Sequence, residues 1–343
     1  MGSPLAQIPL FDLARMSFKV RRATDEDRGI IEATLREYHA DTDSTRRYEW
    51  LYLSNPHGRA LTWLAFDEAS GEFAGMTSFF LRRLTVDGGE ALGALGGDGF
   101  VRPAFRRRGL GRMLHAASRA EMAREGLTVM FGTPMPANVT PLTQVGARTI
   151  AEAVRYARPL RVGRHLPTDF DRLLRRLIRP RVRSARLEAI TAGDRRVDAV
   201  WDQTRGELGI ATVRDANFYD WRFLQSPTQS QKAFIVVDGG RPIAACALER
   251  LENRLRIVDL VAPRANWGRA FGPIATFAPG CALLEIKLLK EDGEARSMWR
   301  HGFFPRDSKP LNLLLPPGEP RAPVLYDPRR WFFTWAESDM DHG

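Results

Sequence analysis

Short apolar runs alternate along the chain with longer stretches in which polar and apolar residues mix. The runs at 62–66 and 233–237 are each closed by a charged or glycine-containing turn, a pattern that is typical of a strand. The mixed stretch 112–125 predicts a helix that follows the run at 95–101. Strands are predicted over 62–66, 95–101, 129–133, 233–237 and 283–288.

One nine-residue segment occurs twice. Tyr48-Glu-Trp-Leu-Tyr-Leu-Ser-Asn-Pro56 returns as Tyr219-Asp-Trp-Arg-Phe-Leu-Gln-Ser-Pro227, at an offset of 171 residues. Repetition over this distance implies two duplicated domains rather than a solenoid, whose repeats are about 20–50 residues long. Later motifs recur in the same order: Val101-Arg-Pro103 as Val261-Ala-Pro263, and Gly146-Ala147 as Gly302-Phe303.

Both halves therefore have the same predicted order of elements. Two helices precede a strand meander, then come a strand ending in Val-x-Pro, a helix, a fifth strand, a helix and a final strand led by glycine. A length of 343 residues also suits two domains. We predict a flexible arm at 1–17, a first domain at 18–162, an arginine-rich linker at 163–185, a second domain at 186–315, and a proline-rich loop with an aromatic and acidic tail at 316–343.

The segment Arg106-Arg-Arg-Gly109-Leu-Gly111 joins a predicted strand to a predicted helix. The first N–H groups of a helix have no intrahelical partner, and the helix dipole adds partial positive charge there. Glycine lets a phosphate approach the backbone closely. The segment therefore predicts a phosphorylated ligand across residues 107–112, the alternative being a basic turn that binds nothing. The nucleotide motifs Gly-x-x-x-x-Gly-Lys-Ser/Thr and, in a strand–helix–strand setting, Gly-x-Gly-x-x-Gly do not occur.

Together with the preceding Asp98-Gly-Phe-Val101-Arg-Pro103, this segment resembles the acyl-CoA pyrophosphate loop of the GNAT acyltransferases. That family has Arg/Gln-x-x-Gly-x-Gly/Ala after a strand, and Arg106, Gly109 and Gly111 stand at its fixed positions. The resemblance implies an α/β (α+β) fold of two tandem GNAT-like domains, each a mixed, twisted sheet flanked by helices. It covers roughly residues 18–160 and, as a pattern, 186–315.

The second copy departs from the family pattern. After Val261-Ala-Pro263 it continues Arg264-Ala-Asn-Trp-Gly268, with one glycine in place of two. We therefore expect a degenerate second copy, and binding of CoA in the first half.

The resemblance also implies how an acyl-CoA donor is held. A β-bulge in the fourth strand admits the pantetheine arm, and a backbone N–H of that strand polarises the thioester carbonyl. Gly96, Gly97 and Gly99 suit such a bulge, although they could instead only relieve packing. The expected acyl-CoA contacts are Phe100, Val101, Arg106, Arg107, Arg108, Gly109, Leu110, Gly111, Arg112 and Asn138.

Candidates for acid–base catalysis are few. Asp98 is the predicted general base, because related enzymes often place a carboxylate at this position, but it could equally be a solvated strand-end residue. Glu90 is a weaker alternative. Many GNAT enzymes carry a tyrosine that protonates the leaving thiolate, and here that position holds Leu142. Tyr156 is the possible substitute acid, or else an aromatic residue of an interface.

Other conspicuous residues have two interpretations. The repeated aromatic motif around Trp50 is typical of core, or else forms a wall of the acceptor pocket. His57 could line the acceptor cleft, whereas His115 is expected to face solvent or the sheet. The tail from Trp331 onward predicts an ordered return of the chain. Its acids Glu337, Asp339 and Asp341 could pair with the linker, bind an acceptor ammonium, or simply face solvent.

Composition narrows the choice of partners. The net charge is +10, and eleven arginines fall within 155–186 against two aspartates. Such a block could bind nucleic acid, an anionic membrane, an acyl carrier protein or a CoA phosphate, or could be a solvated linker.

Two cysteines are too few for a disulfide framework. Neither a leader peptide nor an apolar run of about 18 residues is evident, so we expect a cytoplasmic protein without a transmembrane segment.

The sequence thus favours an N-acyltransferase that moves an acetyl or other acyl group from acyl-CoA to a small-molecule amine by direct transfer in a ternary complex. The alternatives are an acyl-carrier-protein donor, or a non-catalytic acyl-CoA-binding or scaffold protein. Nucleic-acid binding has the weakest support, no metal motif is present, and the sequence does not indicate the oligomeric state.

Overall fold

The computed structural model of the protein describes residues 18–39, 43–160, 185–228, 230–277 and 279–338. The predicted arm 1–17, nearly all of the linker 163–185 and the acids Asp339 and Asp341 lie outside these described residues.

The first half contains the elements expected of it. In chain order they are β1 (Phe18–Arg22), α1 (Arg28–Tyr38), α2 (Ser44–Arg47), a π-helical segment (Tyr48–Leu53), β2 (Leu61–Asp67), β3 (Phe73–Val86), β4 (Gly89–Val101), α3 (Leu110–Glu121), β5 (Leu127–Gly132), α4 (Pro136–Gln144) and β6 (Arg148–Pro159).

The second half repeats this order with shorter helices. Its elements are β7 (Arg186–Ala189), α6 (Arg195–Thr204), β8 (Ile210–Thr212), α7 (Ala216–Tyr219), a π-helical segment (Asp220–Leu224), β9 (Gln231–Asp238), β10 (Arg241–Leu251), β11 (Arg254–Val261), α8 (Trp267–Thr276), β12 (Leu283–Leu289), a 3-10 helix (Ala295–His301), β13 (Phe304–Leu314) and α9 (Ala322–Leu325).

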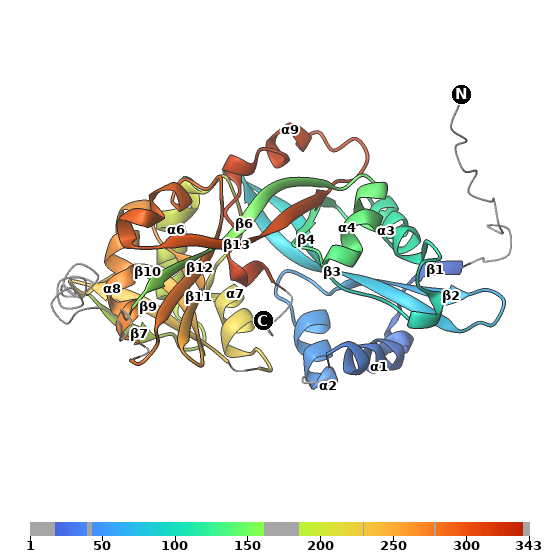
Figure 1. Cartoon of the computed structure of the whole chain (residues 1–343), viewed down its shortest axis with the longest axis horizontal. Helices are drawn as coiled ribbons and strands as arrows, with labels where there is room; N and C mark the ends of the chain where they lie inside the picture. Colours follow the sequence, from blue (N-terminus) through green and yellow to red (C-terminus); the bar gives the residue numbers. More distant parts are fainter. Residues whose placement is uncertain (1–17, 40–42, 161–184, 229, 278, 339–343) are drawn as a thin grey trace, which may run out of the picture.

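One sheet runs through both halves (Figure 1). In the described part of the chain its strand order is β1-β2-β3-β4-β5-β13-β6-β12-β11-β10-β9-β7, and β8 pairs with β3 off this path. Two neighbouring pairs are parallel, β4 with β5 and β11 with β12, and each is connected by a crossover helix, α3 or α8. The duplicated sequence has thus produced the same mixed arrangement of strands twice, as expected of tandem GNAT-like domains.

The two halves exchange their final strands. β13, the last strand of the second half, pairs with β5 and β6, and β6 pairs with β12 along the whole of 283–289. Figure 1 shows β6 and β13 crossing together between the two halves. Each half therefore completes its sheet with a strand of the other, so the predicted boundaries divide the sequence but not the sheet.

The hydrophobic core also crosses the boundary. One large cluster joins residues of both halves, including Phe131 of β5 and Trp331 of the tail, whose rings lie 5.3 Å apart. A second cluster lies under α3, which buries Leu110, Leu114 and Ser118 on one helical face. The aromatic repeat belongs to the large cluster, which agrees with its interpretation as core.

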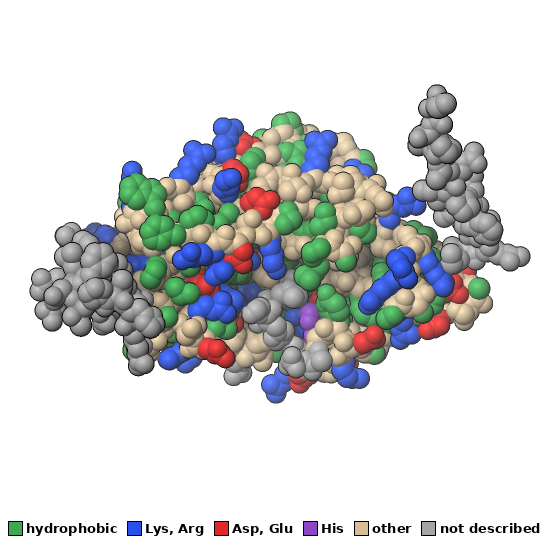
Figure 2. All heavy atoms as spheres, viewed as in Figure 1, with side chains coloured by type: hydrophobic (Ala, Val, Ile, Leu, Met, Phe, Trp, Pro, Cys, Tyr) green, Lys and Arg blue, Asp and Glu red, His purple; other side chains and the backbone are tan. Residues whose placement is uncertain are grey.

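Charge is distributed over both halves. On the face shown in Figure 2, Lys and Arg side chains are interspersed with acidic and hydrophobic ones.

No helix within the described residues is long and apolar enough to cross a membrane.

Candidate active site

A β-bulge interrupts β4 at its C-terminal end. In the pairing with β3, Gly97 faces Ser78 and Phe100 faces Met76, so Asp98 and Gly99 together oppose Thr77. Asp98 has φ of 45°, a left-handed conformation that few residues other than glycine adopt. The bulge expected in this strand is therefore present.

Shortly before the bulge, β4 separates from its parallel neighbour. The pairing of β4 with β5 ends at Leu95 and Phe131. Gly96 is needed at this point, since a Cβ there would lie 2.7 Å from the Met130 sulfur. The last residues of β4 keep their bonds to β3 on one side and leave their other backbone groups open to a ligand.

A groove begins at this opening and runs to the N-terminus of α3. It brings together nearly all the residues predicted to contact acyl-CoA. The predicted residues that line it are Phe100, Val101, Arg106, Arg107, Gly109, Leu110, Gly111, Arg112 and Asn138. Arg108 is the exception, because its guanidinium lies over the Phe105 ring, 5.6 Å from the centroid.

The loop before α3 is shaped by two left-handed residues, Arg107 with φ of 62° and Gly109 with φ of 77°. The Arg106 Nε donates to the carbonyl oxygen of Val101 over 2.9 Å, which leaves the other N–H groups of this exposed guanidinium for a ligand in the groove. This bond ties the loop to the end of β4. The first turn of α3 holds no acidic residue and has no side-chain cap, so its N–H groups can bind an anion.

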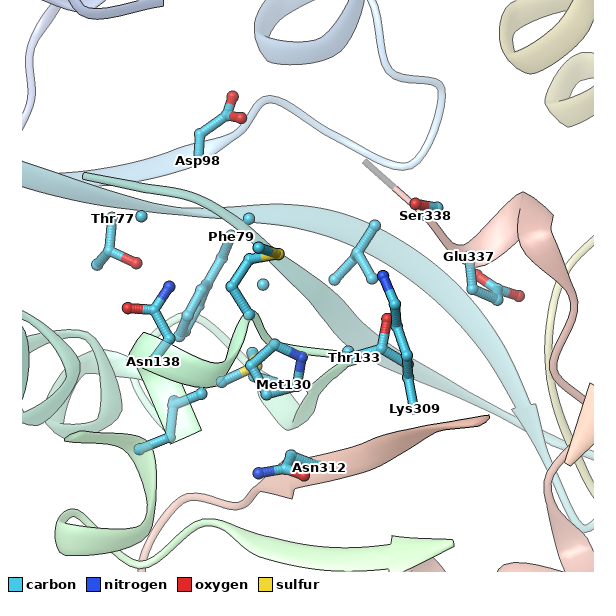
Figure 3. A pocket seen from close by; sticks show the side chains of 18 of the residues that line it. Thr77, Phe79, Asp98, Met130, Thr133, Asn138, Lys309, Asn312, Glu337 and Ser338 are labelled. Carbon is cyan, nitrogen blue, oxygen red and sulfur yellow. The ribbon is translucent and has the colours of Figure 1, made fainter. Parts of the chain in front are cut away.

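The groove leads into a deeper cavity lined by both halves. Gly99, Met135 and Asn138 line both spaces, and a Cβ on Gly99 would lie 3.4 Å from the Asn138 amide nitrogen. Asn138 therefore stands at the junction. The first half also contributes Thr77, Phe79, His115 and Met130, and the second half contributes Arg256, Lys287, Lys309, Asn312, Trp335, Glu337 and Ser338 (Figure 3).

Asp98 is 4% exposed, and its carboxylate is held on both oxygens. Oδ1 accepts from Arg47 over 2.9 Å and lies 3.0 Å from His39 Nε2, and Oδ2 accepts from the Tyr52 hydroxyl over 2.7 Å. Burial by itself raises the pKa of Asp98, but the Arg47 charge and the hydrogen bonds outweigh it and hold the pKa well below its usual range. Figure 3 shows the side chain directed away from the other labelled residues.

These contacts give no support to the prediction that Asp98 is the general base. A carboxylate with a lowered pKa and three partners is a weak proton acceptor. Its position at the bulge instead joins β4 to the helical segment that carries Arg47 and Tyr52.

Tyr156 is not brought to the groove. It lies on β6 between β12 and β13, and it lines a shallow pocket with Lys290, Glu291 and Trp299. The prediction that it protonates the leaving thiolate therefore conflicts with its placement, because a phenol must reach the sulfur to donate a proton. Leu142, at the usual tyrosine position, is buried against the cavity.

Of the two histidines, only His115 lines the cavity, where residues of β3, β4 and β5 lie beside it, so it faces the sheet rather than solvent. Its Nδ1 has no partner within the described residues, and burial lowers its pKa to about 4, so the ring is neutral at pH 7. His57 is stacked on Phe218 with ring centroids 5.6 Å apart and does not line the cavity.

The basic side of the cavity was not predicted from the sequence. Lys287 lies on β12, in a strand that is otherwise apolar except for Glu285. Charged residues two positions apart in an apolar strand share one face, and this was the available signal. Glu337 of the tail does reach the cavity, but it pairs with Arg214 over 2.7 Å rather than with the linker.

The second copy has a closed structure at the place of the loop. Trp267 stands six residues after Val261, as Arg107 stands six after Val101. Its ring is 3% exposed, and its indole N–H donates to the carbonyl oxygen of Ala262 over 3.1 Å. The first residue of α8 is thus part of the core of the second copy, and the segment has one glycine where the first copy has two.

Within the described residues, no group of three or more His, Cys, Asp or Glu side chains could hold a metal ion.

Residues 27–140 match the family model described as "Acetyltransferase (GNAT) family". No curated protein sequence shows a significant match to the chain. Among solved structures, a GCN5-related N-acetyltransferase from Anabaena variabilis has a TM-score of 0.66 at 14% identity, covering 87% of this chain and 73% of that chain. A tandem GNAT protein from the clavulanic acid biosynthesis pathway has a TM-score of 0.55 at 17% identity, covering 87% and 98%. Saccharomyces cerevisiae N-myristoyltransferase, solved with bound myristoyl-CoA, has a TM-score of 0.57 at 10% identity, covering 90% and 81%. These similarities show a shared fold.

Proposed function

Because the chain belongs to the acetyltransferase (GNAT) family through residues 27–140 and has the fold of tandem GNAT proteins, we propose that it transfers an acyl group from acyl-CoA to the amine of a small molecule. The observation that carries this proposal is the continuity between the groove at the N-terminus of α3 and the cavity between the halves, which meet at the bulge of β4. A donor and an acceptor can enter from opposite sides and meet there.

The donor lies with its pyrophosphate on residues 107–112 and its pantetheine arm along Gly99, Phe100 and Val101. The uncapped N–H groups of α3 bind the phosphates, and the open backbone of β4 receives the thioester. A strand N–H beside the thioester carbonyl stabilises the oxyanion as the amine attacks, which is the usual role of such donors in acyl transfer.

Transfer is direct, in a ternary complex. A covalent acyl-enzyme needs an activated nucleophile. Neither cysteine lines the cavity, and burial raises the pKa of the Cys246 thiol, so that thiol stays protonated. The amine therefore attacks the thioester carbon, the tetrahedral intermediate collapses, and CoA leaves as a thiolate that takes a proton from solvent.

The acceptor proton goes to water in the open cavity. Among the described residues, the carboxylates that line it are Asp98 and Glu337, and both are engaged by arginines. We assign Asp98 the role of a positioning residue, which fixes the bulge and so the strand N–H beside the thioester. The rate should then follow the fraction of neutral amine and rise with pH.

A non-catalytic acyl-CoA-binding protein is the second candidate. The observation in its favour is Leu142, which stands at the family's tyrosine position and has no proton to donate. The proposal of an acyl-carrier-protein donor rests on the arginine block 155–186, most of which lies outside the described residues.

Two measurements test the function. Titration with acetyl-CoA, followed by calorimetry, measures donor binding. Thiol release in the presence of a panel of amines measures transfer. Binding with amine-dependent thiol release supports the enzyme, binding without turnover on any amine supports the second candidate, and the absence of binding contradicts both.

A further inference from the structure

Three cations from neighbouring parts of the sheet face the cavity from the second half. Arg256 lies on β11, Lys287 on β12 and Lys309 on β13. Figure 3 shows Lys309 extending from β13 into the pocket beside Thr133. The phosphate-binding loop lies on the far side of Asn138, in the groove, so these cations are placed for the acceptor and not for the phosphates of CoA.

The negative charges of the cavity are already neutralised, whereas two of the positive charges are not. Asp98 is paired with Arg47, and Glu337 accepts from Arg214 over 2.7 Å and from Thr212 over 3.0 Å. In contrast, neither Lys287 nor Lys309 has a carboxylate within 4.0 Å among the described residues of the chain. An empty cavity of this kind has a positive potential.

Trp335 of the tail fixes two of these cations. The Arg256 guanidinium lies 4.8 Å and the Lys287 ammonium 5.1 Å from the centroid of its ring. Holding two like charges over one half-buried ring is unfavourable without an anion nearby, and burial together with Lys309 and Arg256 lowers the pKa of Lys287 to about 7. The described residues of the chain therefore supply no paired counter-charge for Lys287 and Lys309.

Unused hydrogen-bond donors point to the same ligand. Arg256 donates to Glu249 over 2.8 Å, but its buried Nε has no partner within the described residues. The amide nitrogen of Asn312, which is 3% exposed, also has none there. Buried donors without acceptors are rare in folded proteins, and oxygens of a carboxylate or phosphate would satisfy them.

We propose that the acceptor is an amine that carries a carboxylate or phosphate group, and that Lys287, Lys309 and Arg256 bind this group while the amine faces the bulge of β4. The inference rests on the proposed function and specifies the substrate class of the same site. It also implies that amines with several positive charges and no anionic group are poor acceptors, because the cavity repels them.

The test compares acceptors that differ only in the anionic group. L-phenylalanine is compared with phenethylamine, and glucosamine 6-phosphate with glucosamine, which also distinguishes a carboxylate from a phosphate. Thiol release from acetyl-CoA gives kcat and KM. Because the natural amine is unidentified, inorganic sulfate is also titrated into the CoA-saturated protein at constant ionic strength, as a probe of anion binding that needs no turnover.

The variants are Lys287→Met and Lys309→Met, with Lys287→Arg as the charge-conserving variant. Lys290→Met is the matched control, because Lys290 is exposed at the end of β12 and does not line the cavity. Acetyl-CoA binding, measured on each variant, reports that the fold is intact.

We expect at least one anionic acceptor to have a kcat/KM about ten-fold or more above its neutral partner. Either methionine variant should raise the KM of that acceptor and weaken sulfate binding about ten-fold, whereas Lys287→Arg should keep more of the sulfate binding than Lys287→Met, and Lys290→Met should stay close to wild type. Equal turnover of charged and neutral partners, or sulfate binding that is the same in wild type and both methionine variants, overturns the inference and leaves the proposed function standing. Failure of acetyl-CoA to bind contradicts the proposed function itself.

Discussion

Trp50 and Trp221 bind each other reciprocally across the boundary between the two halves. The indole N–H of Trp50 donates to the carbonyl oxygen of Trp221 over 2.7 Å, and that of Trp221 donates to the carbonyl oxygen of Trp50 over 2.8 Å. Their rings are stacked with centroids 5.3 Å apart. The two tryptophans hold the same place in the repeated segment, so the duplicated sequence contacts itself.

Replacing either tryptophan with phenylalanine should destabilise the protein. Phenylalanine keeps a stacked ring but loses the N–H, which leaves a buried carbonyl oxygen without its donor at a cost of about 1–3 kcal/mol. We expect Trp50→Phe and Trp221→Phe each to lower the free energy of unfolding by this amount in urea titrations. Trp299→Phe is the control because Trp299 is 63% exposed. Equal stabilities for all three variants would show that the reciprocal bonds contribute nothing.

The Asp98→Asn variant separates a positioning role from a catalytic one. Asparagine tolerates a left-handed backbone, but the substitution removes the counter-charge of Arg47, which is 1% exposed. Loss of one member of a buried ion pair costs about 3–5 kcal/mol. We expect a large loss of stability and weaker acetyl-CoA binding. Unchanged stability with a large fall in kcat would restore Asp98 as the general base.

The contribution of Asp98 to stability should depend on pH. Its pKa is lowered in the folded protein, so the unfolded chain takes up this proton first as the pH falls. The contribution is fully present above the unfolded pKa of about 3.9 and is lost as the pH falls through the folded pKa. The difference in unfolding free energy between wild type and Asp98→Asn should therefore be constant near neutrality and shrink below about pH 4.

Gly109→Glu should abolish tight acetyl-CoA binding. Gly109 has φ of 77° and nothing within 4 Å of an added Cβ, so glutamate adds backbone strain and a negative charge beside the pyrophosphate. Gly126→Glu is a matched control, with φ of 71° and equally open space at the other end of the same helix region. We expect the dissociation constant to rise about ten-fold or more, ~1.4 kcal/mol, at Gly109 and to change little at Gly126. Similar losses in both variants would attribute the effect to strain.

Anion binding in the cavity should weaken as the pH rises through about 7, because Lys287 then loses its proton. The charged groups that act on it are Lys309 and Asp307 of β13 and Arg256 of β11, while Glu285 on its own face is paired with Arg155. Sulfate keeps its charge across this range, so calorimetric titration from about pH 6 to pH 9 isolates the lysine. Lys287→Met should bind weakly and without this pH dependence. The same slope in that variant would assign the titration to another group.

The donor side of the site could be predicted from the sequence, because its determinants are local. A strand, a turn with Gly109 and a helix N-terminus are adjacent along the chain, and their geometry follows from backbone conformation and from the free N–H groups of the first helical turn. Nearly all the predicted contacts line one groove for this reason. The repeat could also be found in the sequence, since this needs only a comparison of the chain with itself.

The direction of the Asp98 side chain could not be predicted from the sequence. The sequence places a carboxylate at the bulge, but its partners Arg47 and Tyr52, from a distant helical segment, hold both of its oxygens and direct it away from the other labelled side chains of Figure 3.

The sequence by itself therefore determined the order of the elements, the duplication and the open loop before α3 to which we assign the phosphates. Only the tertiary structure decided the acceptor side, where Lys287, Lys309 and the tail residue Trp335 converge. A strand pattern specifies that a strand forms but not which edge it joins, because backbone hydrogen bonds are the same for every partner. The exchange of β6 and β13 brought the second half to the cavity, and with it the charged side chains that we assign to the acceptor.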